Sequence, residues 1–177
     1  IADMPKLGFF PGSTIGNMGP RTAVDLLRTM RETLGEGSQL LIGMDLVKDP
    51  AVLEAAYDDA KGVTGEFNLN LARRINRELG GTIPVESLSH EARWKDDFAR
   101  IEMHLVAGTD IAFEVAGERF TMKAGETIHT ENSHKFKRRS ANTLLLAGGW
   151  TPVQRWLDGQ ERFSVVLAEA SVQRSAP

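Results

Sequence analysis

The sequence contains no cysteine in its 177 residues. This absence excludes a disulfide framework and a thiolate metal site, and it is typical of proteins that work in the cytoplasm. The chain also lacks any apolar run near the ~20 residues that a membrane-spanning helix requires, and its first residues have no signal-peptide pattern. We therefore expect a cytoplasmic protein with no membrane partner.

Charge of one sign is not in excess either, because 21 Lys and Arg face 24 Asp and Glu, for a net charge of −3. This near balance predicts no nucleic-acid partner and no acidic disordered segment. The one dense basic stretch runs from His134 to Arg139. We interpret it as a solvated helix face rather than as a nucleic-acid contact.

The order of the apolar segments predicts an α/β fold. Residues 6–10 and 40–44 are continuous apolar runs, which is typical of strands covered on both faces of a parallel sheet, and a segment with helical spacing lies between them. Residues 140–148 have a helical pattern, and a hairpin turn separates two extended segments, 150–156 and 162–168. A parallel sheet that ends in an antiparallel hairpin predicts the second half of a Rossmann-like α/β sheet.

A different pattern occupies residues 47–135. Helices are predicted near 51–58 and over 64–79, and from Leu88 onward apolar residues alternate with polar ones as in a small antiparallel sheet. On the longer helix, four apolar residues recur every four positions and predict its buried stripe: Phe67, Leu71, Ile75 and Leu79. We therefore expect a core made of residues 1–46 and 136–177, with an α+β substrate-binding cap inserted between them.

The start of the chain suggests that part of this core is absent. Ile1 is not an initiator Met and lies a few residues before a strand, and the glycine-rich cofactor loop of such folds belongs to their first half. We expect a fragment that lacks the N-terminal half of the fold.

Several polar residues lie where a small ligand could bind. Asn17 follows the first strand, beside Gly12 and Gly16, and its amide suits an α-carboxylate and an amine. The alternative for Asn17 is a helix cap or turn residue before Pro20. Gly12 lets the backbone approach a small molecule closely, and it is our candidate for contact with a cofactor.

Tyr57, Glu131 and Ser133 are further candidates. Tyr57 is the only tyrosine, and its hydroxyl needs either a partner such as a ligand carboxylate or a place at the surface where only its ring packs. Glu131 and Ser133 lie two apart, so on a strand they share a face and could bind both nitrogens of an imidazole. The alternative for this pair is a solvated strand end.

Five strings of the sequence together resemble one family, the histidine-specific, S-adenosylmethionine-dependent N-methyltransferases of ergothioneine biosynthesis. They are FFPGSTIGN, GMDLVKDP, AYDDAKGVTGEFNLN, RIEMHL and GETIHTENSHKF. The resemblance extends from about Leu7 to Leu167, and it implies that the predicted sheet is the second half of a class I, Rossmann-like methyltransferase sheet. It implies a methyltransferase that transfers methyl groups from S-adenosylmethionine to the α-amino nitrogen of L-histidine, toward the betaine hercynine.

The resemblance also implies roles for particular residues. It assigns Asn17 to the substrate histidine, Tyr57 to its carboxylate, and Glu131 and Ser133 to its imidazole. Met103, which by itself would be interpreted as a core residue, is implied to line the imidazole pocket. These roles are binding and orientation, and no general base is evident, so the catalytic residue stays unknown.

A metal site is not expected. The string GETIHTE is similar to part of a cupin motif, whose metal needs several histidines and a carboxylate around one cavity. The four histidines of this chain show neither a His-x-His pair nor a helical i, i+4 pair; they are His90, His104, His129 and His134.

Two alternatives to histidine methylation remain open from the sequence. One is an amino-acid-binding or regulatory module that keeps the fold without methyl transfer. The other is a methyltransferase that acts on a different amino acid. The complete reading frame discriminates the first, because an upstream glycine-rich loop favours an enzyme.

Overall fold

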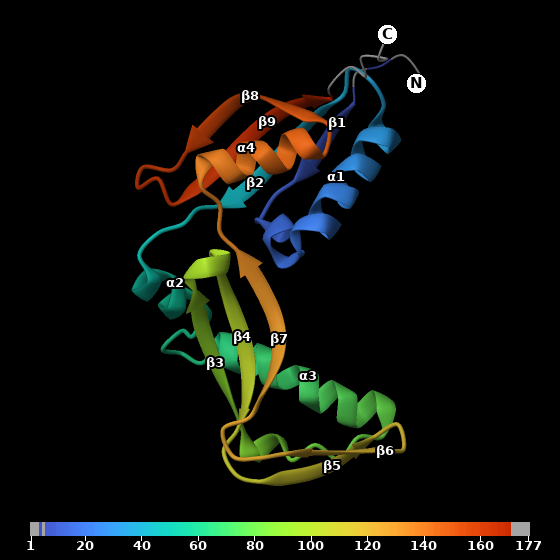
Figure 1. The fold of residues 1–177 in the computed structure, drawn as a ribbon, viewed down its shortest axis with the longest axis vertical. Coiled ribbons are helices and arrows are strands. Elements are labelled where there is room, and N and C mark those ends of the chain that lie inside the picture. The colour runs from blue at the N-terminus through green and yellow to red at the C-terminus, as the bar shows by residue number, and fades with distance from the viewer. Residues whose placement is uncertain (1–3, 5, 171–177) are drawn as a thin grey trace. The chain divides into compact units, whose positions relative to one another are not determined.

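The computed structural model describes residue 4 and residues 6–170, which form two compact units (Figure 1). The first unit contains the chain up to Lys48 and from Ser133 onward, and the second runs from Asp49 to Asn132. The sequence placed the end of the insertion at Lys135, whereas the structure groups Ser133 to Lys135 with the first unit. Among the described residues, no helix is both long and apolar enough to cross a bilayer.

A four-stranded mixed sheet organises the first unit, in the order β1-β2-β9-β8. Its strands are β1 (Leu7–Phe10), β2 (Gln39–Asp45), β8 (Trp150–Leu157) and β9 (Phe163–Ala170). β1 pairs in parallel with β2, whereas β9 pairs antiparallel with both β2 and β8. The predicted parallel pair and the predicted C-terminal hairpin are therefore both confirmed.

Two helices, α1 (Pro20–Leu34) and α4 (Arg138–Ala147), pack against each other and against the strands of this sheet. Along β2, fully buried Leu40 and Ile42 are separated by half-buried Leu41. In the described part of the chain the sheet thus has one fully buried face, not the two that the continuous apolar run predicted. The run is apolar on both faces, but only one of them is fully covered here.

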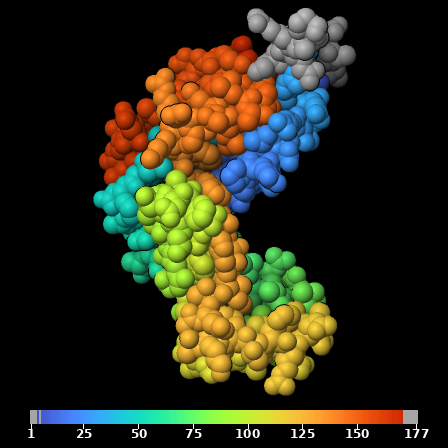
Figure 2. Space-filling model, in the orientation of Figure 1, coloured from blue at the N-terminus to red at the C-terminus, as the bar shows by residue number. Residues whose placement is uncertain are grey.

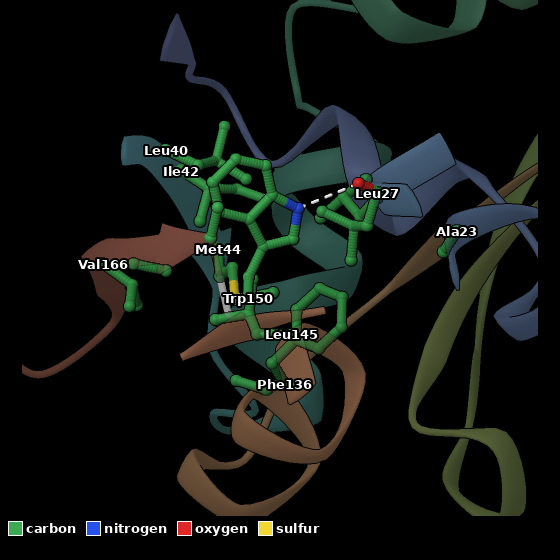
Figure 3. Close-up of a cluster of buried hydrophobic side chains, with 13 residues drawn as sticks. Ala23, Leu27, Leu40, Ile42, Met44, Phe136, Leu145, Trp150 and Val166 are labelled. Carbon is green, nitrogen blue, oxygen red and sulfur yellow. Dashed lines mark hydrogen bonds between the residues drawn. The ribbon is translucent and has the colours of Figure 1, made fainter. Parts of the chain in front are cut away.

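Trp150 is the largest fully buried side chain of the first unit (Figure 3). It lies in one cluster with Leu145 of α4, Met44 of β2 and Phe136. The indole N–H donates a hydrogen bond to the Leu27 carbonyl oxygen of α1, at 2.8 Å. Because its one polar group has a partner, the ring is buried without an unsatisfied donor, and it joins β8 to α1.

The second unit combines two helices with two small sheets. The helices are α2 (Pro50–Tyr57) and α3 (Val63–Leu79). One sheet has the order β3-β4-β7, and β5 pairs with β6 in the other. The strands are β3 (Leu88–Lys95), β4 (Arg100–Ala107), β5 (Ile111–Val115), β6 (Glu118–Met122) and β7 (Thr127–His134). The described part of the chain also contains three short 3-10 helices: η1 (Thr14–Asn17), η2 (Val85–Ser87) and η3 (Asp96–Phe98).

The buried face of α3 differs from the predicted apolar stripe. Its fully buried residues are Asn68 and Ala72, whereas Phe67 is 60% exposed and Leu79 is 55% exposed. Of the predicted stripe, Ile75 packs against the core of the unit. α3, green in Figure 2, therefore presents apolar side chains at the surface of the second unit. The prediction was wrong because a hydrogen-bonded asparagine, which carries no apolar signal, occupies the buried face.

Candidate functional site

The turn after β1 is packed against the carboxyl end of β2. Gly12 and Ser13 both have left-handed backbone, with φ of 75° and 58°. The Ser13 hydroxyl accepts a hydrogen bond from the Asp45 backbone N–H at 2.9 Å. At Gly43 of β2, an added Cβ would lie 3.1 Å from the Gly12 nitrogen, so the two backbones approach closely. The glycine turn thus brings η1 to the carboxyl edge of the sheet, where α/β folds bind ligands.

The conformation of Gly12 accounts for the glycine at this position. A Cβ there would have only Thr14 Oγ1 within 4 Å, at 3.8 Å, so no tight cradle surrounds Gly12. Its positive φ is by itself sufficient to favour glycine. The geometry around Gly12 therefore does not by itself fit a cofactor, and its contact with the methyl donor stays a prediction.

Asn17 is the last residue of η1 and its side chain is exposed. It does not cap α1, whose N-cap is Gly19 without a side-chain bond, so the capping part of the alternative is wrong. Its place in η1 agrees with the other part, a turn residue before Pro20. Among the described residues, no hydrogen bond engages the Asn17 amide. The donors and the acceptor of this amide are therefore available to a ligand.

The segment that carries Asn17 is held against the end of β7. The His134 ring Nδ1–H donates to the Gly16 carbonyl oxygen at 2.9 Å. A Cβ on Gly16 would lie 2.6 Å from the His134 carbonyl oxygen, a distance that real Cβ atoms do not tolerate. Glycine is therefore required at position 16, directly before Asn17, for a close backbone approach.

Lys135 forms a buried ion cluster beside this turn. Its side chain is fully buried, and its ammonium group lies 2.9 Å from Asp45 Oδ2 and donates to Ser133 Oγ at 2.8 Å. Lys48 donates to the other carboxylate oxygen, Asp45 Oδ1, at 2.5 Å. A parallel bridge between Leu46 and Phe136 aligns the end of β2 with this segment. The candidate Ser133, itself buried, is thus part of the cluster.

This cluster corrects the interpretation of the basic stretch as one solvated helix face. Lys135 and Phe136 are buried, and α4 begins only at Arg138. The sequence argument missed Lys135 because a charged residue within a basic run is normally exposed. The signal that was available is the two-residue spacing from Ser133, which places both side chains on one face of an extended segment.

In the second unit, Tyr57 is the last residue of α2 and is half-buried. The His90 ring Nε2–H donates to the Tyr57 carbonyl oxygen at 2.7 Å. His90 Nδ1 is then the acceptor for the Asn68 amide, which lies 2.9 Å away and also donates to the His104 carbonyl oxygen at 3.2 Å. This chain of hydrogen bonds joins the end of α2 to β3, α3 and β4. His90 and Asn68 position Tyr57, a role that sequence reasoning missed.

Met103 and Glu131 come from neighbouring strands of the second unit. Met103 is buried on β4, and Thr130, next to Glu131 on β7, donates from its hydroxyl to the Met103 carbonyl oxygen at 3.0 Å. The Glu131 side chain is half-buried, and burial raises the pKa of its carboxyl group. No hydrogen bond or ion pair within the described chain engages this carboxylate. Glu131 is therefore a partly desolvated acceptor whose ionised form lacks a partner in this structure.

A second group of titratable residues lies on β4 and β7. Ligand atoms of Glu102, His104 and His129 all lie within 4.8 Å of one another, a proximity that the sequence spacing did not reveal. Glu102 is, however, paired with Arg100 and accepts from His104 Nε2 at 3.1 Å. The His104 and His129 rings stack 4.8 Å apart at 17°, so their in-plane lone pairs do not converge on one ion. The arrangement is a network of hydrogen bonds and ion pairs, in which burial lowers the pKa of His104.

The predicted site residues therefore fall into two groups. Gly12, Asn17 and Ser133 belong to the first unit, and the structure connects the segments that carry them through His134 and Asp45. The other three belong to the second unit: Tyr57, Met103 and Glu131. Their joint action on one ligand stays a prediction.

Comparison with known proteins identifies the family. The family model described as "Histidine-specific methyltransferase, SAM-dependent" matches residues 1–170. The histidine N-alpha-methyltransferase of Mycolicibacterium smegmatis is 40% identical over 165 residues, which are 92% of this chain and 51% of that protein. The protein of the same name from Mycobacterium tuberculosis is 39% identical over 165 residues, with the same 92% and 51% coverage. The chain thus spans about half the length of these curated relatives.

A solved structure supports the same assignment at the level of the fold. The CcbJ methyltransferase of Streptomyces caelestis aligns with a TM-score of 0.50 and 14% identity, over 94% of this chain and 61% of that chain. This likeness confirms the predicted α/β, Rossmann-like methyltransferase fold. Together with the family model, which covers nearly the whole chain, it leads to one conclusion: the chain belongs to the family of histidine-specific, S-adenosylmethionine-dependent methyltransferases.

Proposed function

We propose that the protein to which this chain belongs transfers methyl groups from S-adenosylmethionine to the α-amino nitrogen of L-histidine. The family match supports the reaction, and a relative at 29% identity from Neurospora crassa is named ergothioneine biosynthesis protein 1. The observation that carries the substrate choice is Glu131, a partly buried carboxylate without a partner among the described residues. An imidazole N–H is a donor that would satisfy it.

The imidazole of histidine is the proposed ligand of Glu131 and Ser133. A neutral imidazole has one N–H and one bare nitrogen, so it needs one acceptor and one donor. Glu131 supplies the acceptor, and the Ser133 hydroxyl supplies the donor. Met103, buried on the strand next to β7, provides an apolar wall for the ring.

The other end of histidine is the proposed ligand of Asn17 and Tyr57. The exposed Asn17 amide offers donors to the α-carboxylate and an acceptor to the amine. The Tyr57 hydroxyl is a second donor for the carboxylate, and the bonds through His90 hold the helix end that carries it. These residues bind and orient the amine, because methyl transfer needs an aligned lone pair and the exclusion of water.

The methyl donor supplies a methyl group that is already activated for attack. The amine must be neutral to accept it, and among residues 6–170 the structure marks none as the base. We propose that the main cofactor-binding loop lies in the half of the protein that is outside this chain, since the chain covers 51% of its curated relatives. In this proposal residues 49–132 serve as the substrate-binding insertion.

A methyl-transfer assay on two proteins tests the proposal. The complete protein from the full reading frame and the 177-residue chain alone are each incubated with labelled S-adenosylmethionine and histidine, and with tryptophan and tyrosine as controls. We expect label on histidine with the complete protein and none with the chain alone. Label on a different amino acid would contradict the proposed substrate, and binding of histidine without any transfer would contradict the reaction.

Turnover by the isolated chain would show instead that the cofactor site does not need further residues.

A further inference from the structure

In the buried ion cluster of the first unit, the Lys135 ammonium group contacts both a carboxylate, Asp45, and the candidate ligand-binding hydroxyl of Ser133. The Lys135 side chain is fully buried, whereas the Lys48 side chain, on the same carboxylate, is 18% exposed. A buried Lys normally needs a paired charge and further hydrogen bonds to offset the loss of its hydration. Asp45 provides the charge, and the Ser133 hydroxyl oxygen provides a hydrogen-bond acceptor.

The bond from Lys135 determines how the Ser133 hydroxyl can act. A serine hydroxyl has one proton to donate and oxygen lone pairs to accept with. An ammonium group only donates, so at 2.8 Å it occupies a lone pair of Ser133 Oγ and turns the hydroxyl proton away from itself. The positive charge also polarises the O–H bond, which makes the hydroxyl a stronger donor to a third group.

We propose that Lys135 is a positioning and specificity-determining residue, which makes Ser133 a hydrogen-bond donor to the bare ring nitrogen of the substrate. This inference rests on the proposed function and deepens it, because it explains how a hydroxyl that could either donate or accept is restricted to donating. With Glu131 as acceptor and Ser133 as donor, the pair is complementary to a ring that has one N–H and one bare nitrogen. Lys135 itself does not touch the substrate in this proposal.

The contacts of the first unit allow this role to be tested separately from a role in stability. Asp45 is held from three sides, by Lys135, by Lys48 and through its backbone N–H by Ser13. Of these three residues, Lys135 also bonds to Ser133. Substitution of Lys48 is therefore a matched control, because it removes an ammonium group from the same carboxylate and leaves the bond between Lys135 and Ser133 in place.

The test compares histidine with two analogues, 3-(pyrrol-2-yl)alanine and 3-(pyrrol-3-yl)alanine. Each keeps one ring N–H and replaces the bare nitrogen by carbon, at one or the other position. Binding is measured by calorimetric titration of the complete protein. In the wild type we expect histidine to bind about tenfold more tightly than the better analogue, as expected for one hydrogen bond to a polarised hydroxyl.

The variants then separate positioning from stability. Lys135→Met should reduce the preference for histidine to within about twofold, as should Ser133→Ala, and the two together should reduce it no further. Lys48→Met should keep the wild-type preference. If Lys135→Met does not fold because Asp45 is left without its buried partner, Lys135→Met combined with Asp45→Asn removes both charges, and the same loss of preference is expected.

Each outcome has a defined meaning. Equal losses of affinity for histidine and analogue in the Lys135 variants would overturn the inference, because a structural role affects both ligands alike. Loss of the preference in Lys48→Met would also overturn it, since the charge on Asp45 and not the bond to Ser133 would then be decisive. A wild-type protein that does not bind histidine would overturn the proposed function itself, and the role of Lys135 with it.

Discussion

Replacing Glu131 by glutamine is expected to weaken histidine binding and, at the same time, to stabilise the ligand-free protein. The side chain keeps its shape and loses its charge. A hydrogen bond to a charged group contributes about 1.5–3 kcal/mol and a neutral one about 0.5–1.5 kcal/mol. The difference of about 1–1.5 kcal/mol corresponds to a roughly five- to twelvefold higher dissociation constant for histidine in Glu131→Gln.

The gain in stability follows from the raised pKa of the Glu131 carboxyl group. Burial is the cause, and a carboxyl group with a raised pKa binds its proton more tightly in the folded state than in the unfolded state. The free energy of unfolding therefore falls as the pH rises through and above the ordinary value of 4.5. At pH 7 the ionised carboxylate destabilises the fold, and the glutamine variant removes this contribution.

Thermal unfolding of the complete protein at two pH values measures the effect. We expect Glu131→Gln to unfold at a higher temperature than the wild type at pH 7, and at about the same temperature well below pH 4.5, where Glu131 is protonated in both states. Glu118→Gln is a suitable control, because Glu118 is exposed at the start of β6. A lower unfolding temperature at pH 7, or an unchanged affinity for histidine by calorimetry, would refute the reasoning.

Three further substitutions test other parts of the structure. Tyr57→Phe should weaken histidine binding by about 0.5–3 kcal/mol. The loss should be smaller when the ligand is histidine methyl ester. If calorimetry shows that the effects of the substitution and of the esterification are fully additive, Tyr57 does not contact the carboxylate. Gly16→Ala should lower the free energy of unfolding by about 1–3 kcal/mol, because a Cβ there would lie 2.6 Å from the His134 carbonyl oxygen; an unchanged denaturant midpoint would contradict this contact. Trp150→Phe should lower the free energy of unfolding by about 1–3 kcal/mol, because the buried Leu27 carbonyl oxygen loses the indole donor. Equal stability of variant and wild type in urea would show that water or another group replaces this donor.

Local patterns in the sequence were sufficient for most of the elements. The apolar runs that became β1 and β2, the hairpin of β8 and β9, and the helices α2 and α3 are properties of consecutive residues, so their periodicity and turn residues reveal them. The family assignment also came from the sequence, because strings such as FFPGSTIGN and GETIHTENSHKF combine particular residue types with a particular spacing.

The prediction from the sequence was wrong where the burial of a residue depends on partners that are distant along the chain. Phe67 and Leu79 were predicted to belong to the buried stripe of α3, but Asn68 is fully buried instead, and its side-chain NH2 group donates to His90 Nδ1 and to the His104 carbonyl oxygen. No local pattern indicates that a polar residue has found such partners, because hydrogen-bond satisfaction is a property of the assembled fold.

The sequence by itself therefore determined the family, the order of the elements and the candidates Asn17, Tyr57, Glu131 and Ser133. Only the tertiary structure decided what surrounds them. Lys135 is buried because the Leu46–Phe136 bridge aligns its segment with the end of β2, where Asp45 supplies the opposite charge. The physical reason is that strand register brings together residues far apart in sequence, and register is set by the whole core rather than by neighbouring residues.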